Sequence, residues 1–102
     1  MIRVSVMYPN DPNKKFDMDY YLNKHMPVLH EKLDPISLVK AEIDKGLGSR
    51  GENTPPPYRV ICHMYFNTME DFQKILPYEE ELFADVPNYT NIEPVVQISE
   101  MV

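Results

Sequence analysis

Four short segments of the chain alternate apolar and polar residues with the period of a half-buried β-strand. The clearest alternation runs from Tyr58 to Phe66, where every second side chain is large and apolar. Two intervening segments carry apolar residues at the three- and four-residue spacing of amphipathic helices. The pattern predicts the order strand, helix, strand, strand, helix, strand, with the strands at residues 2–8, 38–47, 58–66 and 95–102.

The first predicted helix begins at Asp17 and ends near residue 34. The carboxylate of Asp17 is suited to cap this helix, because it accepts hydrogen bonds from the free amide groups of the first turn. One stripe of the helix is formed by Tyr21, Leu22, His25, Met26, Leu29 and Leu33. Since the stripe is mostly apolar, we expect it to face the sheet and His25 to point inward.

Pro27 interrupts this helix, because proline has no amide hydrogen to donate and its ring crowds the preceding turn. We expect a kink or a restart there, which leaves the carbonyl of Asn23 without its usual partner. Two interpretations stay open. Either His25 faces a polar pocket in an apolar wall, or the kink lets the helix follow a twisted sheet and His25 is a core histidine bonded to the freed carbonyl.

The second predicted helix opens at Thr68, which with Asp71 is similar to a capping box. Pro77 interrupts this helix as well, so two helical pieces are expected.

A long loop, residues 46–57, holds all the glycines of the chain and three consecutive prolines. Its segment Gly46–Gly51 matches the dinucleotide fingerprint G-x-G-x-x-G. That fingerprint binds a pyrophosphate only when the glycine turn opens a helix, whereas here a strand follows. We therefore predict that the loop binds no nucleotide.

The element order is that of the ferredoxin-like βαββαβ sandwich, an α+β fold with a four-stranded antiparallel sheet and both helices on one face. The other face would still carry Ile61, His63 and Tyr65, or Met7 and Met101, depending on which alternation meets the helices. A large exposed apolar face usually marks an interface. We therefore expect a homodimer in which two sheets pack face to face.

Composition narrows the classes of function. The 102 residues suffice for one domain, residues 1–102, with a modest core. The net charge of −6 and the scattered basic residues argue against nucleic acid and anionic membranes as partners. The acidic stretch from Glu70 to Asp85 is interpreted as a solvated helix face. Cys62 is the only cysteine, and it is interpreted as a packing residue. A single cysteine suits a reducing compartment, and we expect no leader segment, so a cytoplasmic location is predicted.

Acid–base chemistry is the class of reaction that the candidate residues favour. His25 and His30 are five residues apart and diverge around a helix, so we expect no metal and no other cofactor. An imidazole exchanges protons near neutral pH, and neighbouring aromatic rings can stack on a planar ligand. The predicted site has His25 as its catalytic residue and the ligand-binding side chains Tyr8, Tyr21, Met26 and Tyr65.

The chain resembles the EthD family over almost its full length. The resemblance is carried by Phe-Asp-x-x-Tyr-Tyr-Leu-x-x-His-Met-Pro at residues 16–27 and by Pro-Asn-x-Thr to Gln-Ile-Ser-Glu at residues 87–100. The family is named after a protein associated with ethyl tert-butyl ether degradation and belongs to the dimeric α+β barrel superfamily. The resemblance therefore implies the same fold and the same dimer that the residues predict.

For function, the resemblance implies a cleft between helices and sheet. Polyketide cyclases, monooxygenases without a conventional cofactor, muconolactone isomerases and haem-degrading enzymes of the superfamily use such a cleft. The family histidine corresponds to His25, with Tyr21 and Pro27 around it.

Two hypotheses follow. The first is a protein that binds or converts a small hydrophobic or planar metabolite, as a cofactor-independent isomerase, cyclase or dehydratase. The second is a non-catalytic homodimeric accessory or ligand-carrying module of a degradation pathway, for instance beside an oxygenase system.

Overall fold

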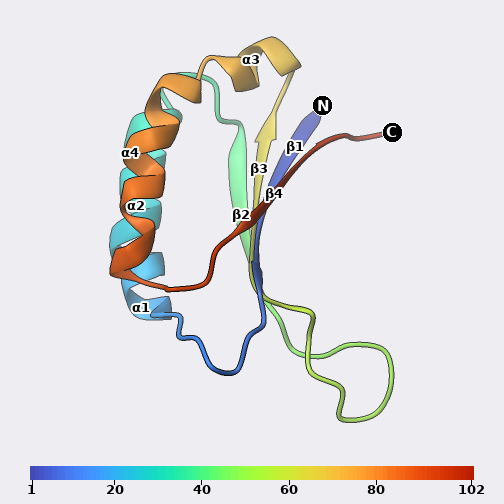
Figure 1. Ribbon diagram of the computed structural model, residues 1–102. Coiled ribbons are helices and arrows are strands. Elements are labelled where there is room, and N and C mark those ends of the chain that lie inside the picture. The colour runs from blue at the N-terminus through green and yellow to red at the C-terminus, as the bar shows by residue number, and fades with distance from the viewer.

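One antiparallel sheet of four strands forms the framework, and all helices cover the same face of it (Figure 1). The structure is a computed structural model that describes residues 1–102. The order across the sheet is β2-β3-β1-β4, which confirms the predicted ferredoxin-like α+β fold. Strands β2 and β4 end earlier than the alternation predicted, and the four strands are β1 (Ile2–Pro9), β2 (Lys40–Lys45), β3 (Tyr58–Phe66) and β4 (Val95–Glu100).

The first helical region has three consecutive parts: α1 (Met18–Tyr20), the π-helical turn η1 (Tyr21–His25) and α2 (Met26–Leu33). Asp17 caps it as predicted, since its Oδ1 accepts from the amide of Tyr20 at 3.1 Å. In the π-turn, the amide of Met26 donates to the carbonyl of Tyr21, five residues back. Pro27 then lies in the first turn of α2, where its missing amide hydrogen is not needed. The predicted restart at Pro27 therefore takes the form of a π-turn.

The second helical region consists of α3 (Met69–Gln73), the 3-10 turn η2 (Leu76–Tyr78), α4 (Glu79–Ala84) and the 3-10 turn η3 (Val86–Asn88). Thr68 caps α3, because its Oγ1 accepts from the amide of Asp71 at 3.1 Å. Pro77 lies in η2 and separates α3 from α4, which confirms the predicted break. Lys32 in α2 and Glu81 in α4 form an ion pair of 2.7 Å, so these two helices run side by side over the sheet.

The core lies between the sheet and the helices. The even-numbered residues of β1 and β3 point into it, among them Val4, Val60 and Phe66, each at most 2% exposed. Met26, Leu29 and Leu33 of α2 pack against them from above. Leu22 is an exception to the predicted stripe, because it is 45% exposed.

The open face of the sheet carries Ile61, His63 and Tyr65 of one predicted set together with Met7 of the other. Met7 is paired with Ile61, and Ser5 with His63, so these side chains share one face together with Tyr65. Polar groups occupy much of this face, and it is less apolar than we predicted.

The long loop 46–57 joins β2 to β3 and projects beyond the end of the sheet, away from the helices (Figure 1). Strand β3 follows it directly, so the glycine segment opens no helix, as predicted. None of the helices combines the length with the apolar composition that crossing a membrane requires.

Candidate functional site

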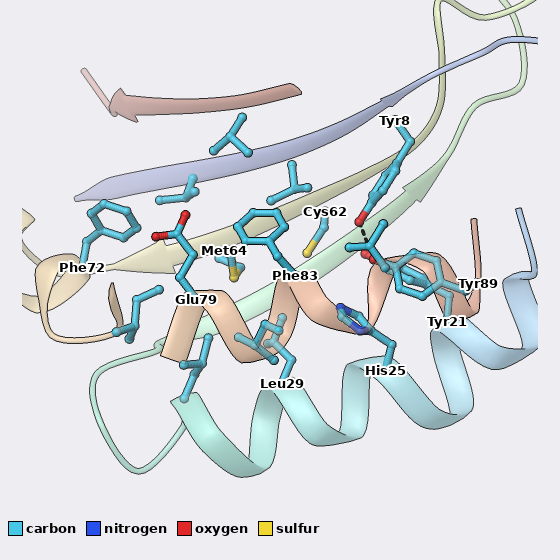
Figure 2. Close-up of a pocket in the computed structure, with 17 residues that line it drawn as sticks. Tyr8, Tyr21, His25, Leu29, Cys62, Met64, Phe72, Glu79, Phe83 and Tyr89 are labelled. Carbon is cyan, nitrogen blue, oxygen red and sulfur yellow. Dashed lines mark hydrogen bonds between the residues drawn. The ribbon is translucent and has the colours of Figure 1, made fainter. Parts of the chain in front are cut away.

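A cavity of about 70 Å³ lies between the helices and the sheet (Figure 2). Fifteen of its seventeen lining residues are hydrophobic, and the two others are His25 and Glu79. Val96 of edge strand β4 and Phe83 of α4 also line it while being 44% and 37% exposed, so the cavity opens to solvent on that side. The site is thus an apolar recess with an imidazole in its wall.

Hydrogen bonds between residues 15–17 and residues 89–90 join two distant segments at the inner end of this cavity. Thr90 pairs with Phe16 in an isolated β-bridge, and its Oγ1 donates to the carbonyl of Lys15 at 2.6 Å. The amide of Asp17 donates to the carbonyl of Tyr89 at 2.7 Å. The start of the first helical region is thereby fixed beside the segment that follows η3. As a result, the ring of Tyr89 lies 4.8 Å from that of His25, centroid to centroid.

His25 is held by Asp85 and not by the carbonyl of Asn23. Its Nδ1 lies 2.9 Å from Oδ2 of Asp85, at the end of α4, and the His25 residue is 6% exposed. Because a carboxylate only accepts hydrogen bonds, Nδ1 carries the hydrogen and Nε2 of the neutral ring has a free lone pair. No protein group is bonded to Nε2. Every fully buried polar side-chain atom of the protein has a hydrogen-bond partner, so the unbonded Nε2 is not fully buried. Nε2 is therefore accessible, on a ring that projects toward the cavity (Figure 2).

Asp85 is fixed by three donors. Besides His25, the hydroxyl of Tyr20 donates to Oδ1 at 2.8 Å, and so does Nδ2 of Asn88 at 2.8 Å. Partial burial opposes the charged form, but the bonds from Asn88, His25 and Tyr20 outweigh it and hold the pKa of the Asp85 carboxyl below its ordinary value. The carboxylate stays ionised and keeps the imidazole in one orientation, as second partners of catalytic histidines do.

Two phenols meet at the inner end of the cavity. The hydroxyls of Tyr8 and Tyr89 are 2.6 Å apart and share a hydrogen bond, which Figure 2 shows as a dashed line. Burial raises the pKa of Tyr8 to about 12 and raises that of Tyr89 as well. Both phenols are therefore neutral hydrogen-bond donors at physiological pH.

Tyr21 and Cys62 complete this wall without offering a charged group. The ring of Tyr21 stacks on that of His25 at 5.4 Å between centroids, and it is 1% exposed. Burial raises the pKa of Tyr21, and it raises the pKa of the Cys62 thiol to about 11. A neutral buried thiol is a weak nucleophile, which agrees with a packing role for Cys62.

The structure places three of the five predicted site residues around the cavity: Tyr8, Tyr21 and His25. Met26 is buried in the core and does not line it. Tyr65 lies on the opposite face of the sheet, where the ammonium of Lys40 stands 4.7 Å from its ring centroid. Its position in β3 explains the difference, because odd-numbered residues of that strand point away from the helices.

Sequence reasoning missed Asp85 and Tyr89. Asp85 belongs to the stretch that we interpreted as a solvated helix face, and that interpretation is wrong for this residue because it binds His25. Tyr89 is the unspecified position inside the Pro-Asn-x-Thr motif. The motif was the only signal, since contact with His25 depends on the β-bridge of Thr90 with Phe16.

The other histidines are engaged elsewhere. Nδ1 of His30 lies 3.0 Å from Asp34, one turn along the same helix, and Nε2 of His63 lies 3.1 Å from Asp44. No three His, Cys, Asp or Glu side chains gather as they would around a metal ion.

A second, shallower hollow of about 410 Å³ lies at the surface between η3 and β4. Glu93 is its only ionisable lining residue, so it offers neither an acid–base pair nor an enclosed wall. We therefore place the candidate site in the cavity that contains His25.

Comparison with known proteins supports one family. The EthD domain matches residues 13–93. No curated protein matches the chain. Among solved structures, an EthD-like protein from Ralstonia eutropha JMP134 has a TM-score of 0.87 and 33% sequence identity, over 97% of this chain and 89% of that one.

Two more distant structures share the fold. An ethyl tert-butyl ether degradation (EthD) family protein from Bacillus halodurans C-125 has a TM-score of 0.70 and 15% identity, over 100% of this chain and 99% of that one. An antibiotic biosynthesis monooxygenase has a TM-score of 0.51 and 8% identity, over 100% and 99%. The domain match and the Ralstonia structure together decide the assignment: the chain belongs to the EthD family.

Proposed function

We propose that this protein binds a small, uncharged hydrophobic metabolite in the cavity and that His25 moves a proton to or from it without a metal. The observation that carries the proposal is the hydrogen bonding of His25. Asp85 occupies Nδ1 at 2.9 Å, while Nε2 has no partner and its ring lines an apolar recess. A general base needs an oriented ring and a nitrogen that can take a proton within reach of its substrate; Asp85 orients the ring, and Nε2 is that nitrogen in the neutral tautomer.

The reaction types that suit this site are isomerisation, cyclisation and dehydration, because each requires proton transfer alone. Apolar walls support such chemistry, since water that competes for the proton is excluded. The fold shared with an antibiotic biosynthesis monooxygenase is compatible with an enzyme, although a fold by itself does not define a function.

A non-catalytic carrier or accessory module is the second candidate function. The size of the cavity favours it, because about 70 Å³ is roughly half of the 150 Å³ engineered cavity that holds one benzene molecule. In this case His25 and Asp85 stabilise the packing of η1 against the end of α4, and a ligand would enter only after the side chains at the rim move.

A titration with ligands separates the two. Purified protein labelled with ¹⁵N in its histidines is titrated with phenol, γ-butyrolactone and cyclopentanone, and the imidazole nitrogens are followed by NMR. The first candidate predicts a saturable shift of Nε2 of His25, with a melting temperature of His25→Gln that equals or exceeds the wild-type value. His63→Gln is the matched control, because it removes a histidine bonded to an aspartate outside the cavity. Binding without any perturbation of Nε2, together with a clear loss of stability in His25→Gln, would favour the carrier.

We also propose a homodimer through the open sheet face. It is supported by apolar side chains that neighbour one another on this face: Met7 pairs with Ile61 of β3 and with Val95 of β4, and Val95 is 47% exposed. Sedimentation velocity is the test: Val95→Lys, on the open face, should give a monomer, whereas Leu47→Lys in the long loop, 90% exposed, should not. A wild-type monomer at high concentration would refute the dimer.

We also propose a cytoplasmic location, which is supported by the single free cysteine, Cys62, because unpaired buried thiols are typical of reducing compartments.

A further inference from the structure

The phenol pair leaves one hydrogen without an acceptor. Two hydroxyls carry two hydrogens, and only one can lie in the 2.6 Å bond between Tyr8 and Tyr89. No other acceptor is bonded to either hydroxyl, although both residues are only 2% exposed. A buried donor hydrogen without an acceptor is costly, so the cavity favours a ligand that accepts this hydrogen.

The imidazole provides the complementary group. Nε2 of His25 is a free acceptor, and its ring lies next to that of Tyr89. The cavity thus presents a free donor from the phenol pair and a free acceptor from the imidazole on neighbouring rings, and apart from Glu79 at the rim the other lining residues are hydrophobic. A guest that satisfies both must carry an oxygen acceptor and, close to it, a hydrogen that a base can remove.

Charge restricts the guest further. No lysine or arginine lines the cavity, while Glu79 stands at its rim and Asp85 lies behind His25. A carboxylate or phosphate would lose its hydration without gaining a cation and would meet two like charges. The guest is therefore neutral.

We propose that the cavity takes the carbonyl end of a neutral, enolisable ketone, with the carbonyl oxygen on the free hydrogen of the Tyr8–Tyr89 pair and the α-carbon at Nε2 of His25. This rests on the proposed function and names its substrate class. The volume of about 70 Å³ admits only this compact end, and the rest of the molecule extends past Phe83 and Val96 to solvent.

The chemical step needs no further reactant. Nε2 takes the α-proton, so that the carbon–hydrogen bond breaks and a nitrogen–hydrogen bond forms. The electron pair moves into a carbon–carbon double bond, and the carbonyl oxygen becomes an enolate oxygen that the phenol hydrogen stabilises. Return of the proton from the imidazolium to the same or another carbon restores the base, and Asp85 stabilises the imidazolium meanwhile.

The test is hydrogen–deuterium exchange at the α-carbons of butanone in D₂O, followed by ¹H NMR over a series of protein concentrations. We expect wild-type protein to accelerate exchange over His25→Gln by about 100-fold or more. Pyruvate, in which a carboxylate replaces the ethyl group, should not be accelerated. His63→Gln, on the open face, should keep the wild-type rate.

Three tyrosine variants examine the phenol pair. Tyr8→Phe with Tyr89→Phe removes both hydroxyls, and it should fold because neither partner is left unsatisfied. We expect this double variant to lose about 100-fold in exchange rate, the usual effect of removing an oxyanion donor. Each single variant should lose less, because the remaining phenol still has a free hydrogen.

The outcomes separate the two proposals. Exchange that depends on His25 but is unchanged in the double variant, or that is as fast for pyruvate, overturns the ketone assignment and leaves proton transfer by His25 in place. No exchange of butanone in any form also overturns the assignment, and the ligand titration then decides the proposed function independently.

Discussion

A histidine bonded to an aspartate lies on each side of the sheet, His25 in the helical layer and His63 in β3, but only one of the two histidines has a free nitrogen. On the helix-covered face, His25 is bonded to Asp85 through Nδ1 alone, and the two side chains are 7% and 27% exposed. On the open face, His63 is bonded to Asp44 through Nε2, and Ser5 Oγ lies 2.9 Å from its Nδ1. There the aspartate is 62% exposed.

The difference shows that a histidine–carboxylate pair is not by itself a site. The series Ser5, His63 and Asp44 contains the residue types of a hydrolase triad, yet both ring nitrogens are occupied and none of the three residues lines either of the two cavities described above. His25 has fewer polar partners, but an accessible nitrogen at an apolar recess. What distinguishes the two is the space beside the ring.

The largest effect should come from removing the aromatic support of the covered face. Tyr21 packs on Phe16 and Tyr89, both at 5.0 Å between centroids, and it is 1% exposed. Tyr21→Ala should lower the free energy of unfolding by about 3–5 kcal/mol, because it opens a large void among rings that cannot collapse. Urea denaturation of dilute protein measures it.

Tyr65→Ala is the counterpart on the open face. This ring is 7% exposed but is covered by the flexible side chain of Lys40, which can rearrange. We expect a loss of about 1–2 kcal/mol. Equal losses for the two variants would contradict the comparison and mean that a second layer covers Tyr65, as the proposed dimer would provide.

The fold could be predicted because alternation along each strand and the apolar stripe of each helix are local properties. Asp17, Thr68 and the two prolines marked where the helical segments begin and break, and the structure has caps and breaks there. The π-turn form of the first break could not be predicted, because it depends on which carbonyl the amide of Met26 reaches. The exposure of Leu22 follows from the same local change in helical phase.

The candidate site could be predicted only in part. His25, Tyr8 and Tyr21 follow from their positions on inward-facing stripes. Asp85 and Tyr89 lie 60 and 81 residues from the side chains with which they bond, His25 and Tyr8. No periodicity links such pairs, so tertiary packing alone brings them together. Tyr65 was misplaced because the alternation of β3 does not reveal which face meets the helices.

A smaller effect is expected from changing the orienting carboxylates. In Asp85→Asn the amide donates to Nδ1 of His25, so the ring hydrogen moves to Nε2 and the free acceptor is lost. The ¹⁵N chemical shifts of His25 should then show a protonated Nε2 and an unprotonated Nδ1, the reverse of the wild-type tautomer. Any proton-transfer activity should fall. The loss in the free energy of unfolding should be about 1–3 kcal/mol, because the buried donors are less well satisfied.

Asp44→Asn is the matched change on the open face. Its effect on the free energy of unfolding should lie within about 0.5 kcal/mol, because that carboxylate is mostly exposed. The resonances of His25 should not change. If Asp85→Asn left Nε2 of His25 unprotonated, Asp85 would not be the group that sets the tautomer.

The smallest effect concerns pH. Hydrogen bonds from Asn88, His25 and Tyr20 hold the pKa of Asp85 below its ordinary value despite partial burial. A depressed pKa means that the native state favours the carboxylate, so the contribution to stability is complete above about pH 4 and is lost as the pH falls through the lowered pKa. The asparagine side chain of Asp85→Asn does not ionise, so the variant lacks this pH-dependent contribution to stability. The difference in the free energy of unfolding between wild type and Asp85→Asn should therefore narrow below about pH 4, while the difference for Asp44→Asn stays small throughout. Urea denaturation at about pH 3 and pH 6 measures both, and a constant difference for Asp85→Asn would mean that its bonds to His25 and Tyr20 do not favour the charged form.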